Sequence, residues 1–122
     1  MADRGAMVTS WGDGRPGVPA AKGMEVFAKS LAWYDELAKE GRITGYRVYG
    51  SLTRAHGMTV AEGDVAELAK ISTEPKATTL LALASAVVQD VRTEIFVGGS
   101  PDDVVGFYNR TIDALAQAGL VD

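Results

Sequence analysis

The chain of 122 residues contains no cysteine. Disulfide bonds, thiolate nucleophiles and cysteine-based metal sites are therefore excluded. Histidine is nearly absent as well, because His56 is the only one, and no residues at a recognised metal-ligand spacing accompany it. We therefore expect no metal ion and no bound cofactor.

Long apolar runs and clusters of basic residues are also missing. The longest apolar run, residues 80–88, contains Ser85 and is far shorter than the roughly 20 residues that cross a bilayer. The 12 basic residues are scattered and the formal net charge is −4, whereas nucleic-acid binding needs clustered Lys and Arg. Residues 1–5 are not followed by the apolar core of a secretory signal. We expect a cytoplasmic protein with neither a membrane nor a nucleic acid as partner.

What the chain does contain is enough for one globular domain over residues 1–122. Hydrophobic residues make up 47% and charged residues 23% of the sequence, which is ordinary for a globular protein. A chain of this length buries roughly two-thirds of its unfolded surface. We therefore expect a single domain with a substantial core.

In the first half of the chain, the spacing of the hydrophobic residues changes from the spacing of a helix to that of strands. Helical spacing gives way to strict alternation after Gly41, and Gly and Pro mark the connections. The pattern predicts a strand over 6–11, a loop over 12–19, a helix over 20–40, and a hairpin of strands over 43–53 and 58–62. Two strands joined by so short a turn, at residues 54–57, must be antiparallel.

The second half adds helices around one more strand. Asp64 is predicted to cap a helix, with Glu67 as its capping-box partner. Ser100 is followed by a proline and two acids, a strong signal for a helix N-terminus. The pattern predicts a short helix from 64, a helix over 76–87 after Pro75, a strand over 91–97, and a helix from 100 to about 119.

This order predicts an α+β fold of the ferredoxin-like type, βαββαβ, with an extra C-terminal helix. The four strands form one antiparallel sheet, and the main helices cover one of its faces. The other face starts uncovered, and an exposed sheet face with apolar side chains calls for a partner. We expect a homodimer with two-fold symmetry, a dimeric α/β barrel with a cavity between its two sheets.

Strand alternation predicts which side chains face away from the helices. In the hairpin, Val48 and Leu52 are expected to meet the helices. The outward set is then Met7, Thr9 and Trp11, with Arg47, Tyr49 and Ser51, and Arg92, Glu94 and Phe96. The candidate ligand-binding residues drawn from it are Trp11, Arg47, Tyr49, Arg92, Glu94 and Phe96. Such a mixture suits a small-ligand cavity, but it also suits a plain dimer interface, which we favour.

Several short segments carry a family resemblance. They are Thr9–Gly12, Arg15–Gly17, Lys22–Phe27, Glu40–Ile43 and Ala61–Asp64, with the strand near Val91. In these segments, over most of its length, the chain resembles a family of small bacterial proteins that has no agreed activity. That family is assigned to the ferredoxin-like, dimeric α/β-barrel superfamily, so the resemblance implies a homodimer. It carries over no catalytic residue. The wider superfamily includes cofactor-free monooxygenases and haem-degrading enzymes.

The residues from Gly12 to Gly17 spell G-x-G-x-x-G between a strand and a helix. We reject a dinucleotide site, because Pro16 and Pro19 stand where the phosphate-binding helix should already run. Arg15 remains a candidate for contact with an anionic ligand near the start of the following helix.

Other candidate residues each have a structural alternative. His56 is the only candidate general base, but a histidine beside a turn glycine is more often a solvated turn residue. Glu62 and Asp64 resemble an acid pair, although Asp64 is better explained as a helix cap. Tyr34 is expected in the core, and Trp33 at an interface or edge.

Two functions of different classes fit these observations. The first is a homodimer that binds a small ligand, or only its partner, across the free sheet face. The second is a cofactor-independent monooxygenase or isomerase acting on a small aromatic or quinol-like substrate. In that case Trp11, Arg47, Tyr49 and Arg92 would position the substrate and His56 would move a proton. Haem binding through His56 is a third, weaker alternative.

Overall fold

The computed structural model describes residues 3–121. Within that range the helices and strands follow the predicted order, with small shifts at their ends. The strands are β1 (Arg4–Trp11), β2 (Gly45–Gly50), β3 (Gly57–Asp64) and β4 (Arg92–Val97), and the helices are α1 (Ala20–Lys39), α2 (Val65–Ser72), α3 (Pro75–Val87) and α4 (Pro101–Gln117).

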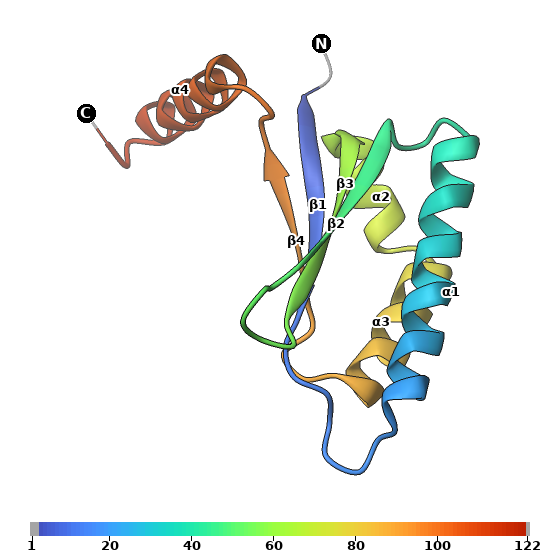
Figure 1. Cartoon of the computed structure of the whole chain (residues 1–122). Coiled ribbons are helices and arrows are strands. Elements are labelled where there is room, and N and C mark those ends of the chain that lie inside the picture. The colour runs from blue at the N-terminus through green and yellow to red at the C-terminus, as the bar shows by residue number, and fades with distance from the viewer. Residues whose placement is uncertain (1–2, 122) are drawn as a thin grey trace.

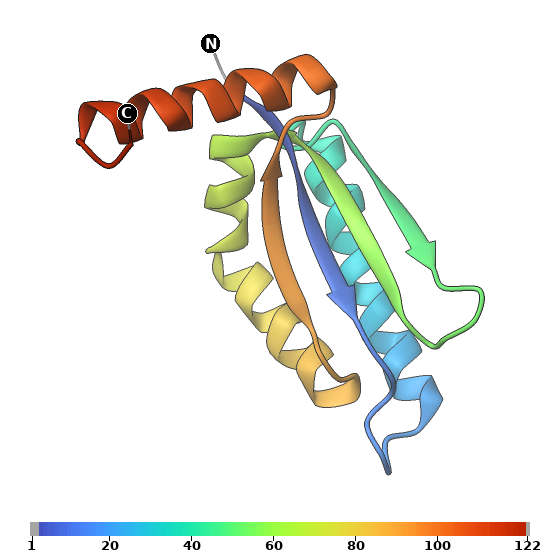
Figure 2. The same cartoon turned by 90° about the vertical axis from the view of Figure 1, so that its left-hand side faces the viewer.

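The strands form one sheet in the order β2-β3-β1-β4, in which every neighbouring pair is antiparallel. α1 and α3 lie side by side on one face of this sheet, with α2 near one end (Figures 1 and 2). The predicted α+β fold, ferredoxin-like with an extra C-terminal helix, is confirmed. Among the described residues, no helix combines the length and the hydrophobicity that crossing a membrane requires.

The core lies between the sheet and the helices. Met7, Leu68 and Ile71 are its largest fully buried side chains, and burying each contributes about 1.5–3 kcal/mol. α2 supplies Leu68 and Ile71, so this short helix closes one end of the core. The buried hydrophobic residues are Met7, Trp33, Tyr34, Leu37, Ile43, Ala61, Leu68, Ile71, Ala77 and Leu80.

We call the face without α1 and α3 the open face. The strand register places its side chains in three rows: Arg92, Ser10, Met58 and Tyr49; then Glu94, Val8, Val60 and Arg47; then Phe96, Ala6 and Glu62. The predicted outward orientation of Arg47 and Tyr49 in β2, and of Arg92, Glu94 and Phe96 in β4, is confirmed by this register and by their exposure.

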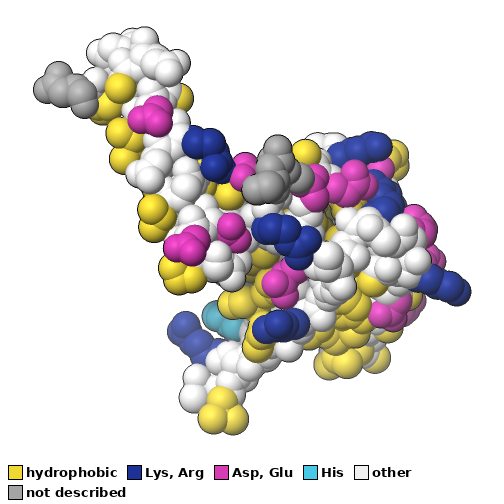
Figure 3. Space-filling view, turned by 90° about the horizontal axis from the view of Figure 1, so that it is seen from above, with side chains coloured by type: hydrophobic (Ala, Val, Ile, Leu, Met, Phe, Trp, Pro, Cys, Tyr) yellow, Lys and Arg dark blue, Asp and Glu magenta, His cyan; other side chains and the backbone are white. Residues whose placement is uncertain are grey.

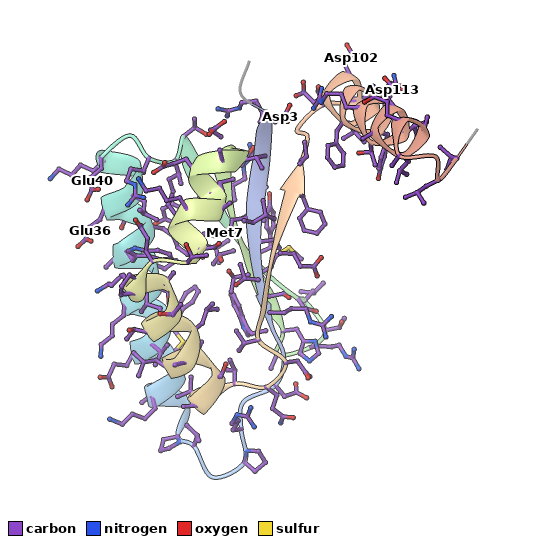
Figure 4. The ribbon with its side chains drawn as sticks, turned by 180° about the vertical axis from the view of Figure 1, so that it is seen from behind. Asp3, Met7, Glu36, Glu40, Asp102 and Asp113 are labelled. Atoms are coloured by element: carbon purple, nitrogen blue, oxygen red, sulfur yellow. The ribbon has the colours of Figure 1, made fainter. Side chains whose placement is uncertain are left out.

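The predicted orientation of β1 is wrong. Met7 is 2% exposed and points toward the helices (Figure 4), in register with Ala61 of β3 and Ile95 of β4. Because side chains alternate along a strand, Thr9 and Trp11 share this covered face. The physical reason is that β1 is a central strand with apolar residues on both of its faces, so alternation alone does not show which face lies in the core.

The connection between β2 and β3 is also longer than predicted. β2 ends at Gly50, and Leu52 is fully exposed instead of meeting the helices. The Ser51 hydroxyl accepts hydrogen bonds from the amides of Thr53 and Arg54, and the Ser51 amide donates to the carbonyl of His56. Because the Ser51 hydroxyl binds the amides that follow it, the backbone turns here and the strand ends before Leu52.

Asp64 caps α2 as predicted, since its carboxylate accepts a hydrogen bond from the Glu67 amide at 3.1 Å. The predicted return contact from the Glu67 side chain is not formed. That carboxylate instead accepts a hydrogen bond from Arg42 Nε at 2.7 Å, while the other Arg42 nitrogens donate to Glu74 at 2.8 and 3.1 Å. A guanidinium binds carboxylates in this forked geometry more strongly than a backbone amide does. Arg42 thus joins the segment before β2 to α2 and to the start of α3.

α4 stands apart from the other elements. It leaves the end of β4 and projects past the body of the molecule (Figures 1 and 2). The Ser100 hydroxyl accepts a hydrogen bond from the Asp103 amide at 3.2 Å, which confirms the predicted cap. The helix contains no buried residue.

Candidate functional site

Two adjoining cavities lie between the sheet and the helices. Their volumes are about 450 and 400 Å³, within the range of small-molecule sites. Four residues line both cavities, namely Thr9, Ser30, Tyr34 and Ala84. Small side chains leave this space open, because Ala77 and Ala84 of α3 stand where larger residues would reach the sheet. We call the pair the interior cavity.

Hydroxyl groups provide the polar part of the interior cavity. The phenol of Tyr34 lies 2.9 Å from the Thr59 hydroxyl, and both residues are buried. The hydroxyls of Thr9 and Thr93 lie 3.0 Å apart. A hydroxyl can donate one hydrogen bond and accept two, so each pair keeps capacity for a further partner. The cavity therefore offers two hydrogen-bonding points among apolar walls.

Aromatic packing fixes the position of Tyr34. Its ring contacts Trp33 at 5.3 Å between centroids and stacks on Tyr46 at the same distance. The Tyr46 phenol donates a 2.6 Å hydrogen bond to Asp35, and this bond together with partial burial raises the pKa of Tyr46. Trp33, predicted at an edge, is 8% exposed and lines the cavity. The phenol of Tyr34 is therefore held in one place by its neighbours.

The walls of the interior cavity are uncharged. Among the described residues, no Asp, Glu, Lys, Arg or His lines either part of it. Burying an unpaired charge costs several kcal/mol, so this environment disfavours an ionised guest and accepts a neutral one.

The loop at residues 12–19 closes one end of the cavity, which Gly14, Val18 and Pro19 line. Backbone hydrogen bonds hold it against the segment after α3: the Gly12 amide donates to the Gln89 carbonyl at 2.7 Å, and the Gln89 amide to Asp13 at 2.8 Å. We call residues 12–19 the strap.

Two sequence-based hypotheses concern the strap. Arg15 Nε donates to the Ser85 carbonyl, so this nitrogen is engaged within the chain, and contact of Arg15 with an anion stays a prediction. Part of the G-x-G-x-x-G segment forms this antiparallel contact, in which Gly14 pairs with Val88, and Pro19 directly precedes α1.

The structure brings together five of the six predicted ligand-binding residues on the open face. Arg47 lies 3.6 Å from Glu62 in an exposed ion pair, and Tyr49, Arg92, Glu94 and Phe96 occupy the same face. The sixth, Trp11, packs its ring edge-on against Phe27 of α1 at 5.7 Å and lines the interior cavity. It also lines a hollow at one end of the open face, together with Tyr49 and Arg92. Three of the six predicted residues therefore line one hollow, and the ligand-binding role of the set stays a prediction.

His56 lies outside the interior cavity. It lines an open hollow of about 610 Å³ at one end of the open face, together with Tyr49, Met58 and Arg92. Its Nε2 is 3.3 Å from Asp13 of the strap, and about a third of the side chain is exposed. His56 is thus neither a free turn residue nor a base aimed at an enclosed substrate. Within residues 3–121 no cluster of three or more potential metal ligands occurs.

Sequence reasoning missed most of the cavity hydroxyls. Thr9 was assigned to the opposite face, and Ser30, Thr59 and Thr93 were not singled out. Threonine in a strand is common, and its role here depends on which strands become neighbours. The one available signal was Tyr34 on the apolar stripe of α1, since a buried tyrosine hydroxyl usually needs a partner.

No model of a protein family matches the sequence, and a search of curated proteins finds no match. Solved structures do match. A cofactor-independent oxygenase, SnoaB from Streptomyces nogalater, is 14% identical with a TM-score of 0.63, over 81% of this chain and 96% of its own. A dimeric protein of unknown function and ferredoxin-like fold from Bacteroides fragilis is 10% identical with a TM-score of 0.57, over 77% and 96%. A dimeric ferredoxin-like protein from Thermobifida fusca is 14% identical with a TM-score of 0.55, over 79% and 92%.

These likenesses establish the ferredoxin-like fold and agree with the resemblance to bacterial proteins of this superfamily. At such low identity, function does not transfer with the fold.

Proposed function

We propose that the protein is a cytoplasmic homodimer that binds a small, uncharged, ring-bearing molecule in the interior cavity of each subunit. The single observation that carries this proposal is a cavity with apolar and aromatic walls, no charged lining residue and two hydroxyl pairs. A cytoplasmic location suits a chain without cysteine, because such a chain forms no disulfide bonds that an oxidising compartment would maintain.

The lining sets the chemistry of the ligand. Trp11, Phe27 and Trp33 offer ring surfaces, and aromatic contacts add about 0.5–1.5 kcal/mol beyond simple burial. The Tyr34–Thr59 pair is placed to bind a carbonyl or hydroxyl oxygen of the guest. A planar molecule with one or two such oxygens fits best. This places the site within each subunit, whereas the sequence analysis expected it between the two sheets.

A neutral fluorescent probe tests this proposal. N-phenyl-1-naphthylamine is apolar, aromatic and uncharged at neutral pH, so we expect its fluorescence to rise on binding. Ala84→Phe fills the space shared by both parts of the cavity and should weaken probe binding at least about tenfold. Ala82→Phe adds the same ring to the exposed side of α3 and should leave binding unchanged.

An equal effect of the two substitutions, or no probe binding by the native protein, contradicts the proposal. Circular dichroism and thermal unfolding of each variant show whether the fold is intact.

The open face supports the dimer. Tyr49 and Phe96 are each 50% exposed and Met58 is 40% exposed, a set typical of interfaces. If a two-fold axis runs along the strands between two stacked sheets, β4 lies over β2 of the partner subunit. In the second row, Glu94 then meets Arg47 of the partner subunit, and the reverse contact forms by symmetry. An axis across the strands would instead bring two copies of Glu94 together.

Sedimentation velocity over a dilution series tests the dimer. Phe96→Glu places a charge in the apolar part of the open face and should shift the protein to monomers. Thr79→Glu, on the exposed side of α3, should leave the dimer intact. A native protein that sediments as a monomer at every concentration would contradict the dimer.

The second candidate function is a cofactor-independent monooxygenase. The observation that favours it is the structural likeness to SnoaB, which is named as a cofactor-independent oxygenase, combined with a cavity suited to a neutral aromatic guest. A neutral quinol-like substrate supplies the electrons for the reduction of O₂ itself. A ring CH₂ becomes a carbonyl with one oxygen atom, and the other oxygen leaves as water with both hydrogens. The Tyr34–Thr59 pair would hold the substrate oxygen.

Oxygen uptake distinguishes the two functions. Anthrone is a neutral tricyclic substrate, and an oxygen electrode should show that the protein consumes O₂ with it faster than the uncatalysed reaction does. Ala84→Phe should abolish this additional uptake, whereas Ala82→Phe should retain it. If the protein binds the probe but takes up no oxygen with a series of such substrates, the binding function is supported and the oxygenase function is excluded.

A further inference from the structure

α4 carries an apolar stripe that is largely exposed within the subunit. Residues spaced three or four apart share one side of a helix, and Tyr108 and Ile112 on this side are 58% and 53% exposed. Figure 3 shows hydrophobic side chains along the outer edge of the projecting helix. The stripe consists of Val104, Val105, Tyr108, Ile112 and Leu115.

The polar side of α4 is the one that holds the helix to its own subunit. Arg110 lies half a turn away from the stripe and donates a 2.7 Å hydrogen bond to Asp3, just before β1. Asp102 and Asp113 also lie on the side away from the stripe and point upward from the helix (Figure 4). The ion pair therefore anchors the polar side of α4 to the body through Arg110 and leaves the apolar stripe free.

The connection from β4 keeps α4 in this direction. Gly98 and Gly99 have φ values of +135° and +134°, which residues with a side chain rarely adopt. The Gly98 amide donates a 2.8 Å hydrogen bond to the Arg4 carbonyl. As Figure 1 shows, the helix stands on the side of the sheet opposite α1 and α3, which is the side of the open face.

We propose that α4 is an arm that packs its apolar stripe against the flank of a second copy of this chain. The inference rests on the homodimer proposed above and adds the element that completes its interface. Two sheets packed face to face lie about 10 Å apart. With 17 residues, α4 is about 25 Å long, which is more than the spacing between two packed sheets, so it is long enough to reach the flank of the partner.

The area of the open face argues that such an arm is needed. Four strands about 4.8 Å apart, with about six paired residues of 3.4 Å each, offer roughly 400 Å² in projection. A stable interface buries about 800 Å² on each partner. α4, about 25 Å long and about 10 Å wide, adds roughly 250 Å² and brings the total near the required size.

Charge and geometry disfavour other occupants of the stripe. Asp102, Asp103 and Asp113 outnumber Arg110 on the polar side of α4, so an anionic membrane surface would repel the helix. Folding back over its own open face would break the Arg110–Asp3 pair and the Gly98 hydrogen bond. A second copy requires neither rearrangement.

Substitutions on the two sides of α4 test the arm. Tyr108→Glu with Ile112→Glu places two charges on the stripe, whereas Asn109→Glu with Gln117→Glu places the same charges on the exposed polar side. We expect the first pair to raise the dimer dissociation constant at least about 100-fold, as the loss of an apolar hot spot does. The second pair should change it less than about threefold. Sedimentation velocity gives the constants, and far-ultraviolet circular dichroism confirms the helix.

The outcomes separate the arm from the dimer. If the stripe variant dimerises like the native chain while Phe96→Glu is monomeric, the arm is refuted and the open-face dimer stands. If both α4 variants weaken the dimer equally, charge alone explains the effect and the arm is refuted. A monomeric native chain refutes the dimer itself.

Discussion

The phenol of Tyr34 and the hydroxyl of Thr59 satisfy each other in the interior, 2.9 Å apart and both nearly inaccessible to solvent. Removing either hydroxyl leaves the other buried without this partner, at a cost of about 1–3 kcal/mol. Tyr34→Phe and Thr59→Val should each lower the free energy of unfolding by that amount. The double variant should cost about 1 kcal/mol less than the sum. Urea denaturation of all four proteins measures this coupling, and strict additivity would show that the contact contributes nothing.

Arg42 and Glu74 make the stability of the protein depend on pH. Hydrogen bonds from Arg42 lower the pKa of Glu74 below its ordinary value of 4.5. A lowered pKa means that the stabilisation is fully present above pH 4.5 and is lost as the pH falls through the folded-state value. Glu74→Gln should therefore destabilise at pH 7, with a difference from the native protein that shrinks in acid.

Urea midpoints between pH 7 and 3 measure that difference. Glu25→Gln is the matched control, because Glu25 pairs only with exposed lysines of its own helix and should have little effect at any pH. A Glu74→Gln difference that stays constant down to pH 3 would contradict the role of this pair.

Among the elements, β1 is the strand most tightly enclosed, since β3 and β4 flank it and α2 lies close to Gly5. A Cβ at Gly5 would overlap the carbonyl oxygen of Phe96 and come 2.5 Å from Val65 Cγ2. Gly5→Ala should therefore destabilise by about 2–3 kcal/mol, because the backbone of β4 must move. Gly45→Ala in the edge strand β2 meets nothing within 4 Å and should be nearly neutral. Thermal unfolding compares the two, and equal stabilities would disprove the close contact.

The elements themselves could be predicted because each is marked by local chemistry. Ser100 and Asp64 cap helices in the structure as their sequence context indicated. The orientation of β1 could not be predicted, because Met7 and Val8 are both apolar and the choice between them depends on which residues of β3 and β4 become neighbours. The side chain of Glu67 likewise follows a distant residue, Arg42.

At the scale of the whole molecule, the proposed two-fold arrangement makes a specific prediction about charge. Arg47→Glu and Glu94→Arg should each weaken the dimer, because each places like charges opposite one another across the interface. Combining them restores the opposite pairing and should recover most of the affinity. Sedimentation velocity at low salt measures the three variants. Additive weakening in the double variant would rule out a symmetry axis along the strands.

At this scale the sequence did not indicate the interior cavity, and the open-face site stays a prediction. The sequence indicated a sheet with one free face, and aromatic and charged residues on that face suggested a binding site there. The interior cavity arises instead from small residues such as Ala77 and Ala84 facing the sheet. An alanine in an amphipathic helix gives no sign of whether its neighbours fill the space beside it, since this depends on how far apart the layers pack.

The backbone hydrogen bonds of the strap have a consequence for kinetics. The amides of Gly12, Arg15 and Gln89 are all bonded across this closure, so a guest enters or leaves that end only when several of these bonds break together. Opening at that end is therefore a cooperative local event, and hydrogen exchange at these three amides measures how often it occurs.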